Sequence, residues 1–288
     1  MTTAGGGPYC WRVKAPGSRW RRGAAKQREL RALRDVIDSF SERIGGAESL
    51  ERCLDLLLEA VAPLGFSSII YDYAPVPVAH DGRMIRPNLL NARNIPNDFT
   101  GLWCDQGYYR IDPVQQTCIE SNLPFLWSFT GSNDHLLERP LTREHQPVIA
   151  YLKDTRLSCG ATVPIHSRDG SLATVTAIRI DAEDGFERFA RRELATFAYL
   201  AHFMHEAALR SFDEETRRCH AVSLSPREIE CLRWAARGKT AEDIAEILDR
   251  APATICLHLN NAQHKLGAQN RAQAIARAAH YRLLGAGL

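Results

Sequence analysis

The sequence L-S-P-R-E-I-E-C-L-R-W-A-A-R-G-K-T-A-E-D-I-A, residues 224–245, decides the fold of the C-terminal part of this 288-residue chain. Ser225 precedes Pro226, and Glu228 follows three positions after the serine. This order is typical of a capping box, in which each of the two polar side chains accepts a hydrogen bond from the other residue's backbone N–H. Proline is favoured in the first turn of a helix because the N–H it lacks would have no partner there. The pattern predicts a helix that begins at Pro226.

Three more helices with short connections follow this one. Gly238 favours the left-handed residue that ends a helix, and Thr240 is suited to cap a second. Pro252 begins a third helix with a polar face, and Asn270 caps a fourth. Two short helices, a tight turn and a longer polar helix are typical of a helix-turn-helix, whose second helix lies in the DNA major groove. We therefore interpret residues 223–288, the rear domain, as a DNA-binding domain.

The longer part of the chain, residues 27–210, is the front domain. Apolar residues recur at helical spacing in three segments, residues 30–40, 50–61 and 187–210. F-S-S-I-I-Y-D-Y at residues 66–73 has the composition of a strand, and Asp169-Gly170 between two β-rich runs predicts a hairpin. Helices around antiparallel strands predict a layered domain. The fold class is therefore α+β, with an N-terminal α/β/α sandwich on an antiparallel sheet and a C-terminal four-helix, all-α helix-turn-helix domain.

Composition and cysteine spacing restrict the class of protein further. Hydrophobic residues make up 45% and charged residues 24% of the chain, which is typical of folded globular proteins. No run approaches the roughly 18 consecutive apolar residues of a membrane-spanning helix, and residues 1–24 lack the apolar core of an export signal. The eight cysteines stand singly, so reduced thiols are expected rather than disulfides or a zinc ribbon. We expect a cytoplasmic protein with no membrane partner.

Charge is distributed unevenly along the chain. The net charge is +6 over residues 1–26, −7 over residues 27–222 and +3 over residues 223–288. The first segment mixes Gly, Pro and Arg without a period, so we interpret it as a flexible basic leader. Residues 211–222 are polar without an apolar period and are expected to be a linker. The basic rear end favours contact with a polyanion, although an excess of +3 does not establish nucleic-acid binding.

Aromatic residues concentrate around Asp112-Pro113 in the front domain. They are Phe99, Trp103, Tyr108, Tyr109, Phe125, Trp127 and Phe129. Apolar walls with a few polar groups make a ligand pocket, but such density is also typical of a core. Asp112 also has two interpretations. It can be a polar group of such a pocket, or it can cap a helix, as Asp before Pro commonly does. The residues alone leave both questions open.

Catalytic and metal-binding signatures are missing from the sequence. His202 and His205 lie three apart on a helix, yet no third ligand accompanies them at a suitable spacing. No nucleophile elbow and no phosphate-binding glycine loop is present. We therefore expect no enzyme, no metal and no cofactor. The rival from another class, an enzyme with a fused DNA-binding module, would need a nucleophile or a metal set.

The rear domain resembles the DNA-binding domain of the LuxR family over nearly its full length. The matching positions are Glu228, Leu232, Gly238, Ile244, Ala245, Thr254, His258, Lys265 and Leu266. The front domain resembles the autoinducer-binding domain of quorum-sensing members of that family. D-P-V at residues 112–114, P-F-L-W ending at Trp127, and Gly160 before a strand carry this second resemblance.

The resemblance implies a ligand-responsive transcription regulator that senses an acyl-homoserine lactone in quorum sensing. The implied ligand-binding residues are Phe99, Trp103, Asp112, Pro113, Trp127, Gly160 and Thr176. The family has a tryptophan, which donates to the lactone carbonyl, where this chain has Phe99, and a tyrosine where it has Trp103. Either the indole N–H of Trp103 compensates or the ligand is not an ordinary lactone. The alternative is an orphan regulator that senses another metabolite or acts without a ligand.

The resemblance also implies partners for the rear domain. The implied DNA-binding residues are Thr240, Thr254, Cys256, Leu257, Asn260, Asn261, His264, Lys265 and Arg271. Asn260 can pair with adenine and Leu257 can contact a thymine methyl. A helix-turn-helix usually reads two half-sites, so we expect a homodimer on an inverted-repeat operator. The apolar sides of the helices at residues 187–210 and 271–284 are the expected dimer surfaces.

Overall fold

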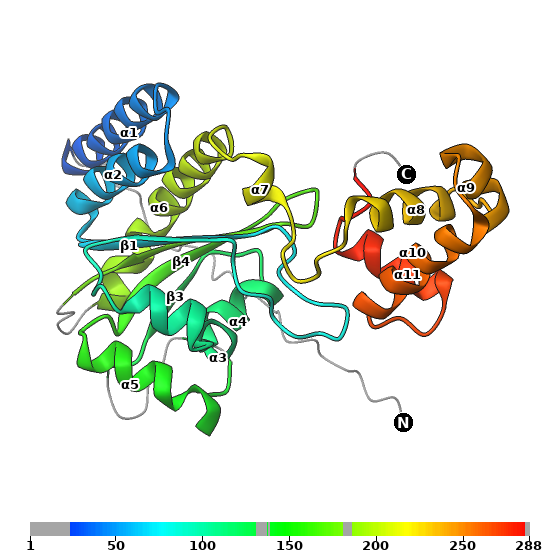
Figure 1. The fold of residues 1–288 in the computed structure, drawn as a ribbon. Coiled ribbons are helices and arrows are strands. Elements are labelled where there is room, and N and C mark those ends of the chain that lie inside the picture. Colours follow the sequence, from blue (N-terminus) through cyan, green and yellow to red (C-terminus); the bar gives the residue numbers. More distant parts are fainter. Residues whose placement is uncertain (1–23, 131–136, 138, 181–185, 286–288) are drawn as a thin grey trace, which may run out of the picture.

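The computed structural model describes residues 24–130, 137, 139–180 and 186–285. Residues 1–23 of the expected basic leader lie outside this range. Two bodies lie side by side, one built around a sheet and one built of helices, and a single segment that includes α7 (Glu214–Arg217) connects them (Figure 1). No helix among the described residues is both long and apolar enough to cross a membrane.

The front domain is built on a five-stranded antiparallel sheet. The strands, in the order of the sheet, are β2 (Leu89–Arg93), β1 (Ser68–Ala74), β5 (Leu172–Ile178), β4 (Cys159–His166) and β3 (Phe125–Ser128). The hairpin expected at Asp169-Gly170 joins β4 to β5, and Gly170 has the positive φ of 80° that this turn needs. The order leaves β2 and β3 as the edge strands of the sheet.

Helices cover both faces of the sheet, which confirms the α/β/α sandwich (Figure 1). One face carries α1 (Ala24–Gly45), α2 (Leu50–Val61) and α6 (Phe186–Leu209); the other carries the π-helical turn η2 (Gly101–Asp105), α3 (Tyr108–Ile111), α4 (Pro113–Glu120) and α5 (Gln146–Asp154). Alternate residues of β1 point to opposite faces. Ile69 and Tyr71 accordingly belong to the core under α2 and α6, whereas Ile70 belongs to the core under α4 and α5.

The rear domain consists of α8 (Pro226–Ala236), α9 (Ala241–Leu248), α10 (Pro252–Lys265) and α11 (Arg271–His280). The expected capping box of Ser225 and Glu228 is present, and a second one joins Thr240 to Asp243. Gly238 follows α8 with a φ of 83°. Asp249 supplies the left-handed residue between α9 and α10, with a φ of 51°. These local features end one helix and start the next, which produces the helix-turn-helix.

The segment at residues 211–222 is less independent of the domains than its polarity indicates. Phe212 is buried in the core under α6, and Cys219 is buried in the core of the rear domain. The Nδ2 of Asn88, just before β2, donates to the carbonyl of Thr216 at 2.8 Å and to that of Arg218 at 2.7 Å. The segment is therefore held against both domains.

The loop between β1 and β2 contacts the end of α11. Val76 is buried in the same apolar cluster as the rear-domain core, and Ala79 and Ile85 pack against that cluster. Nδ1 of His80 lies 2.6 Å from the hydroxyl of Tyr281, which also accepts from the backbone N–H of His80 at 3.4 Å. Front and rear domains thus share a mixed apolar and polar interface.

Two further polar contacts reinforce this interface. Nε2 of His280 donates to the carbonyl of Val78 at 2.8 Å. The guanidinium of Arg282 pairs with the carboxylate of Asp169, in the β4–β5 turn, at 3.0 Å. The C-terminal end of α11, expected as part of a dimer surface, is therefore occupied by the front domain of the same chain.

Candidate functional site

A small apolar cavity lies between the sheet and the helices η2, α4 and α5. Among the described residues it is lined by Ile70, Leu90, Phe99, Trp103, Asp112, Val114, Gln115, Trp127, Leu152, Thr176 and Ile178. Its free volume of about 20 Å³ has room for about one water molecule. Pockets for small molecules of drug size have roughly 300–1,000 Å³. A ligand of that size must therefore displace side chains that fill the cavity here.

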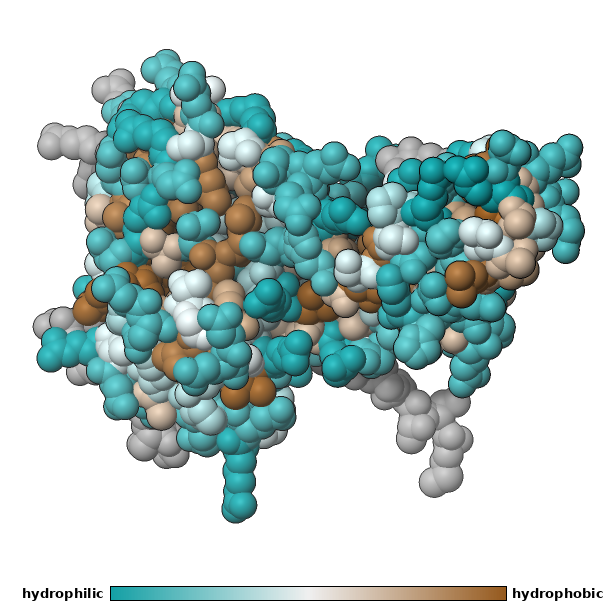
Figure 2. Space-filling model, in the orientation of Figure 1, coloured by the Kyte–Doolittle hydropathy of each residue, from teal (hydrophilic) through white to brown (hydrophobic). Residues whose placement is uncertain are grey.

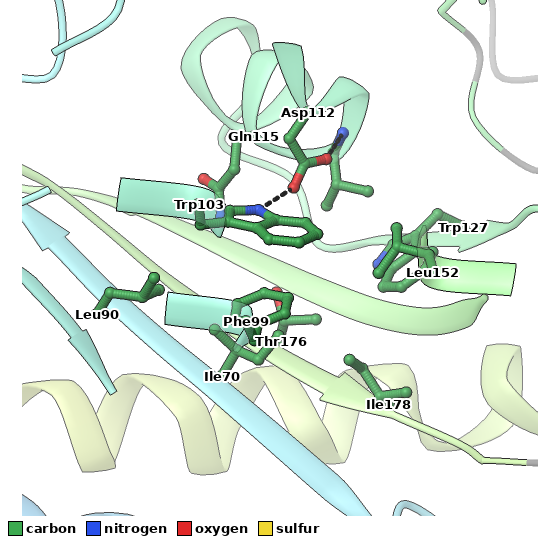
Figure 3. A pocket seen from close by; sticks show the side chains of 11 residues that line it. Ile70, Leu90, Phe99, Trp103, Asp112, Gln115, Trp127, Leu152, Thr176 and Ile178 are labelled. Carbon is green, nitrogen blue, oxygen red and sulfur yellow. Dashed lines mark hydrogen bonds between the residues drawn. The ribbon is translucent and has the colours of Figure 1, made fainter. Parts of the chain in front are cut away.

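Asp112 caps a helix and also faces the cavity. Its Oδ1 accepts from the backbone N–H of Val114 at 2.8 Å, which caps α4. Its Oδ2 accepts from Nε1 of Trp103 at 2.9 Å, inside the cavity (Figure 3). Burial raises the pKa of Asp112 to about 6, although the donors from Trp103 and Val114 lower it in part. The carboxylate is thus both a helix cap and a polar group of the cavity wall.

The side chains of Trp103 and Phe99 pack beneath Asp112 in the cavity wall (Figure 3). Their rings stack, with centroids 3.9 Å apart and planes 17° from parallel (Figure 3). Each side chain is only 2% exposed. Because the indole N–H of Trp103 is donated to Asp112, it is already used within the chain. Neither ring therefore offers a free donor to a lactone carbonyl in this arrangement.

Trp127 forms another wall of the cavity through a chain of hydrogen bonds. Its Nε1 donates to the hydroxyl of Thr162 at 2.9 Å, and Thr162 lies 2.9 Å from the hydroxyl of Thr176. Gly160 permits this packing, because a Cβ there would lie 2.8 Å from the Trp127 ring and 2.7 Å from the carbonyl oxygen of Ala177. Thr176 brings a hydroxyl to the otherwise apolar floor of the cavity.

A buried polar cluster lies next to this cavity. Asp72 of β1 is fully buried and accepts from the hydroxyls of Tyr109 and Thr174 and from Nε2 of Gln115. Burial raises the pKa of Asp72 to about 7, against the effect of these three donors. The cluster joins α3, α4 and the two central strands. It was not expected from the sequence, since its members are far apart in the chain.

The cavity brings together most of the ligand-binding residues expected from the sequence. Phe99, Trp103, Asp112, Trp127 and Thr176 line it. Pro113 takes the first position of α4, and Gly160 lies against the Trp127 ring, so these two shape the wall without lining it. Sequence reasoning missed Gln115, although its position one helical turn after Asp112 could have indicated it. It also missed the apolar strand residues Ile70, Leu90 and Ile178.

Helix α10 presents a polar and exposed face in the rear domain. Ile255, Leu259 and Ala262 are buried in the domain core, which turns the opposite side of the helix outward. Cys256, Leu257, Asn260, Asn261 and His264 are exposed on that side. Leu257 is 57% exposed, which is unusual for leucine. A helix with this face, preceded by a tight turn, can enter a major groove.

The remaining residues expected to contact DNA lie at the two ends of α10 and at the starts of α9 and α11. The hydroxyl of Thr240 caps α9, and the guanidinium of Arg271 donates to the carbonyl of Lys239. Thr254 is partly exposed in the first turn of α10. Lys265 donates to Glu228 at 2.8 Å, and this carboxylate is almost completely buried. Lys265 therefore also holds α10 against α8.

Two family models match the chain. One, described as the autoinducer binding domain, covers residues 49–208, and the other, bacterial regulatory proteins of the luxR family, covers residues 222–278. The first spans the sheet and its helices except α1, and the second spans the helix-turn-helix. The matches coincide with the two bodies of the fold.

Characterised relatives resemble the chain over both bodies. The transcriptional activator protein BjaR1 of Bradyrhizobium diazoefficiens is 30% identical over 262 residues, which cover 87% of this chain and 96% of the relative. The HTH-type quorum sensing-dependent transcriptional regulator RpaR of Rhodopseudomonas palustris is 31% identical, with 86% and 92% covered. The crystal structure of Escherichia coli SdiA shares the fold, with a TM-score of 0.54, 23% identity, and 91% of this chain and 99% of that chain covered.

Proposed function

The chain belongs to the LuxR family of transcriptional regulators, with an autoinducer-binding domain before its DNA-binding domain, and we propose that its ligand is an acyl-homoserine lactone bound beside Asp112. The protein would act in the cytoplasm as a homodimer on an inverted-repeat operator. Binding of the lactone would change the affinity of the rear domains for that operator. The buried carboxylate of Asp112 in an apolar cavity is the observation that carries the proposal.

The chemistry of the cavity fits an acylated amide. A buried carboxylate gains most from a charge-assisted hydrogen bond, which the amide N–H of such a ligand supplies. The hydroxyl of Thr176 can donate to the acyl carbonyl, because Thr162 can in turn supply the proton that Thr176 accepts. Ile70, Leu152 and Ile178 provide apolar walls for an acyl chain. The ligand would take the volume now filled by the stacked rings.

Phe99 and Trp103 support a second candidate, a metabolite without a lactone ring. The phenyl ring of Phe99 has no donor, and the indole N–H of Trp103 is committed to Asp112. A lactone carbonyl at this end of the cavity would lack a partner unless Trp103 turned away from the carboxylate. An unpaired buried polar group costs about 1 to 3 kcal/mol. An amide or hydroxyl ligand without that carbonyl would avoid this cost.

Helix α6 is the surface we propose for homodimer formation. Tyr199 is 45% and Phe203 37% exposed, and their rings contact each other with centroids 4.7 Å apart. Figure 2 shows hydrophobic residues gathered on the visible face of the front domain, whereas the visible face of the rear domain is mostly hydrophilic. Exposed aromatic pairs are favoured at protein interfaces. A dimer through α6 would leave α10 of each protomer free for a half-site.

Coupling between the two domains requires the ligand to favour one of their arrangements. Only a difference in ligand affinity between two arrangements can shift their populations. The segment from β1 to β2 connects the cavity physically to the rear domain, because Leu90 lines the cavity and His80 contacts Tyr281. A ligand that widens the cavity would move β2, and this movement would change the contact between His80 and Tyr281. In this proposal, the loop between β1 and β2 transmits ligand binding to the rear domain.

Ligand-induced stabilisation of the full-length protein tests the proposed function. A panel of acyl-homoserine lactones of increasing chain length is added, and the melting temperature and the affinity for DNA are measured. The free fatty acids of the same length are the matched controls, since their carboxylates would be repelled by Asp112. We expect stabilisation by at least one lactone and by none of the acids. A panel in which no lactone raises the melting temperature would contradict the lactone assignment.

A further inference from the structure

We propose that Gln115 is a second polar anchor of the ligand site and that the ligand carries, besides its amide N–H, a further O–H or N–H donor for Gln115 Oε1. This inference rests on the proposed function, because it assumes that the cavity beside Asp112 is the ligand site. It adds a residue and a chemical class of ligand that the family resemblance did not imply.

Gln115 lies in the cavity wall one helical turn after Asp112. It is 5% exposed and lines the cavity together with Asp112 and Trp103 (Figure 3). Its Oε1 is buried and, among the described residues, has no hydrogen-bond partner. Almost all buried polar atoms of folded proteins are hydrogen-bonded, so an exception in a cavity wall requires an explanation. A donor on a ligand would supply the missing partner.

The buried cluster around Asp72 fixes which way the Gln115 amide points. The hydroxyl of Thr174 donates to Oδ2 of Asp72, so towards Gln115 the threonine oxygen can only accept. Nε2 of Gln115 lies 2.9 Å from the same carboxylate oxygen and 3.3 Å from the threonine oxygen. When Asp72 is ionised, both atoms that face this end of the amide are acceptors, so the end is the nitrogen. Turning the amide over would place its oxygen against both of these acceptors.

Asp72 and Thr174 thus hold the nitrogen end of the Gln115 amide, and its Oε1 has no partner among the described residues. Tyr109 holds the other oxygen of Asp72 at 3.1 Å, so the carboxylate is fixed from α3 as well as from β5. Asp72 and Thr174 act as positioning residues, since they hold the amide without lining the cavity. The site thus presents two acceptors, the Asp112 carboxylate and Gln115 Oε1. A ligand that matches both needs two donors.

The spacing of the two acceptors indicates where the second donor lies. Asp112 is the N-cap of α4 and Gln115 lies in the first turn of that helix, so the two acceptors are neighbours at one end of α4. A hydroxyl on the β-carbon of an acyl chain is three carbons from the amide nitrogen, so a single ligand can carry both donors at neighbouring positions. A β-keto group at the same place would present an acceptor to Gln115 Oε1, and an unsubstituted chain would present nothing. We therefore infer a preference for β-hydroxyacyl ligands.

The test compares three lactones of one chain length, unsubstituted, β-keto and β-hydroxy, on the full-length protein. Affinities are taken from ligand-induced stabilisation of the wild type, Gln115→Met and Gln116→Met. Methionine keeps the length of glutamine without its polar atoms. Gln116 is the matched control because it follows Gln115 on α4 and hydrogen-bonds to Arg110 and His145 instead of lining the cavity.

We expect the wild type and Gln116→Met to bind the β-hydroxy lactone about threefold to tenfold more tightly than the unsubstituted one, the usual range for one neutral hydrogen bond. Gln115→Met should bind the two equally. Equal affinities in the wild type, or a preference that survives in Gln115→Met, would overturn the inference and leave the lactone assignment intact. If no lactone stabilised the wild type, the proposed function would fall and this inference with it.

Discussion

Nδ1 of His80 lies 2.6 Å from the hydroxyl of Tyr281, although the two residues are 201 positions apart in the chain. The rings meet edge to face, with centroids 5.9 Å apart. His80 belongs to the loop between β1 and β2, and Tyr281 follows α11 directly. The contact joins the loop before β2, the strand whose Leu90 lines the cavity, to the end of the last helix of the DNA-binding domain.

Tyr281→Phe should weaken the coupling between the domains. Phenylalanine keeps the buried ring and removes the hydroxyl that bonds to His80. We expect the ligand-induced change in DNA affinity to fall by about threefold to tenfold, which corresponds to one or two neutral hydrogen bonds. Fluorescence anisotropy of labelled DNA with and without ligand measures this change. Tyr71→Phe is the control, because it also removes a tyrosine hydroxyl bonded to a histidine, His205, but inside the front domain. An equal ligand effect in both variants would show that the contact of His80 with Tyr281 does not transmit the signal.

Asp72 should give the stability of the protein a pH dependence of unusual sign. Burial raises its pKa to about 7, far above the value of about 3.9 in an unfolded chain. Between these values the folded state binds more protons than the unfolded state, so its contribution to the free energy of unfolding falls as pH rises. Buried His205, whose pKa is lowered to about 4, acts in the opposite sense below about pH 6.5.

Comparison with Asp72→Asn isolates this contribution, because His205 is common to both proteins. Urea unfolding at pH 5, 6, 7 and 8 should show a difference in unfolding free energy that shifts in favour of Asp72→Asn with each step. The asparagine amide can still accept from Gln115 and donate to Tyr109. A difference that stays constant over this range would mean that Asp72 is ionised throughout.

Gly160→Ala should destabilise the front domain. The added Cβ would meet a backbone carbonyl at 2.7 Å and the buried ring of Trp127 at 2.8 Å, so strand β4 or the ring must move. Overpacking of this kind costs about 1 to 3 kcal/mol. Gly45→Ala, with no atom within 4 Å of the added Cβ, is the matched control. Thermal melting should separate the two variants, and equal melting temperatures would disprove the close packing.

Asn260→Ala should reduce affinity for the preferred operator by about 1 to 3 kcal/mol, the value of one bidentate base contact. Asn260 is exposed on the same side of α10 as Leu257. Binding to unrelated DNA should change little, because phosphate contacts dominate it. Titrations with both DNAs give the ratio of the affinity for the operator to the affinity for unrelated DNA. An equal loss on both would make Asn260 a residue that positions the helix instead of reading bases.

Local signals explain why much of the fold could be predicted. The capping boxes at Ser225 and Thr240 and the turn at Gly170 depend on neighbours within four positions, and all three are present in the structure. The buried set around Asp72 depends on Thr174, Tyr109 and Gln115, which only the folded sheet brings together. No spacing in the sequence reveals such contacts.

The same distinction explains Asp112. The sequence offered a helix cap and a ligand acceptor as alternatives, since capping is local and the position of Trp103 is not. One oxygen caps α4 while the other accepts from the indole. Asp112→Asn alone is therefore a poor test, because an asparagine that keeps the cap would turn its N–H towards that of Trp103.

The central claim is that the ligand amide donates to Asp112, and it is tested most directly in a Trp103→Phe background. Phenylalanine keeps the stack on Phe99 and removes the competing indole N–H. We predict that the stabilising lactone raises the melting temperature of Trp103→Phe at least as much as that of the wild type. In the double variant with Asp112→Asn, affinity should fall about tenfold to a hundredfold, the loss of one charge-assisted hydrogen bond. A double variant that responds to the ligand as strongly as Trp103→Phe would contradict the claim.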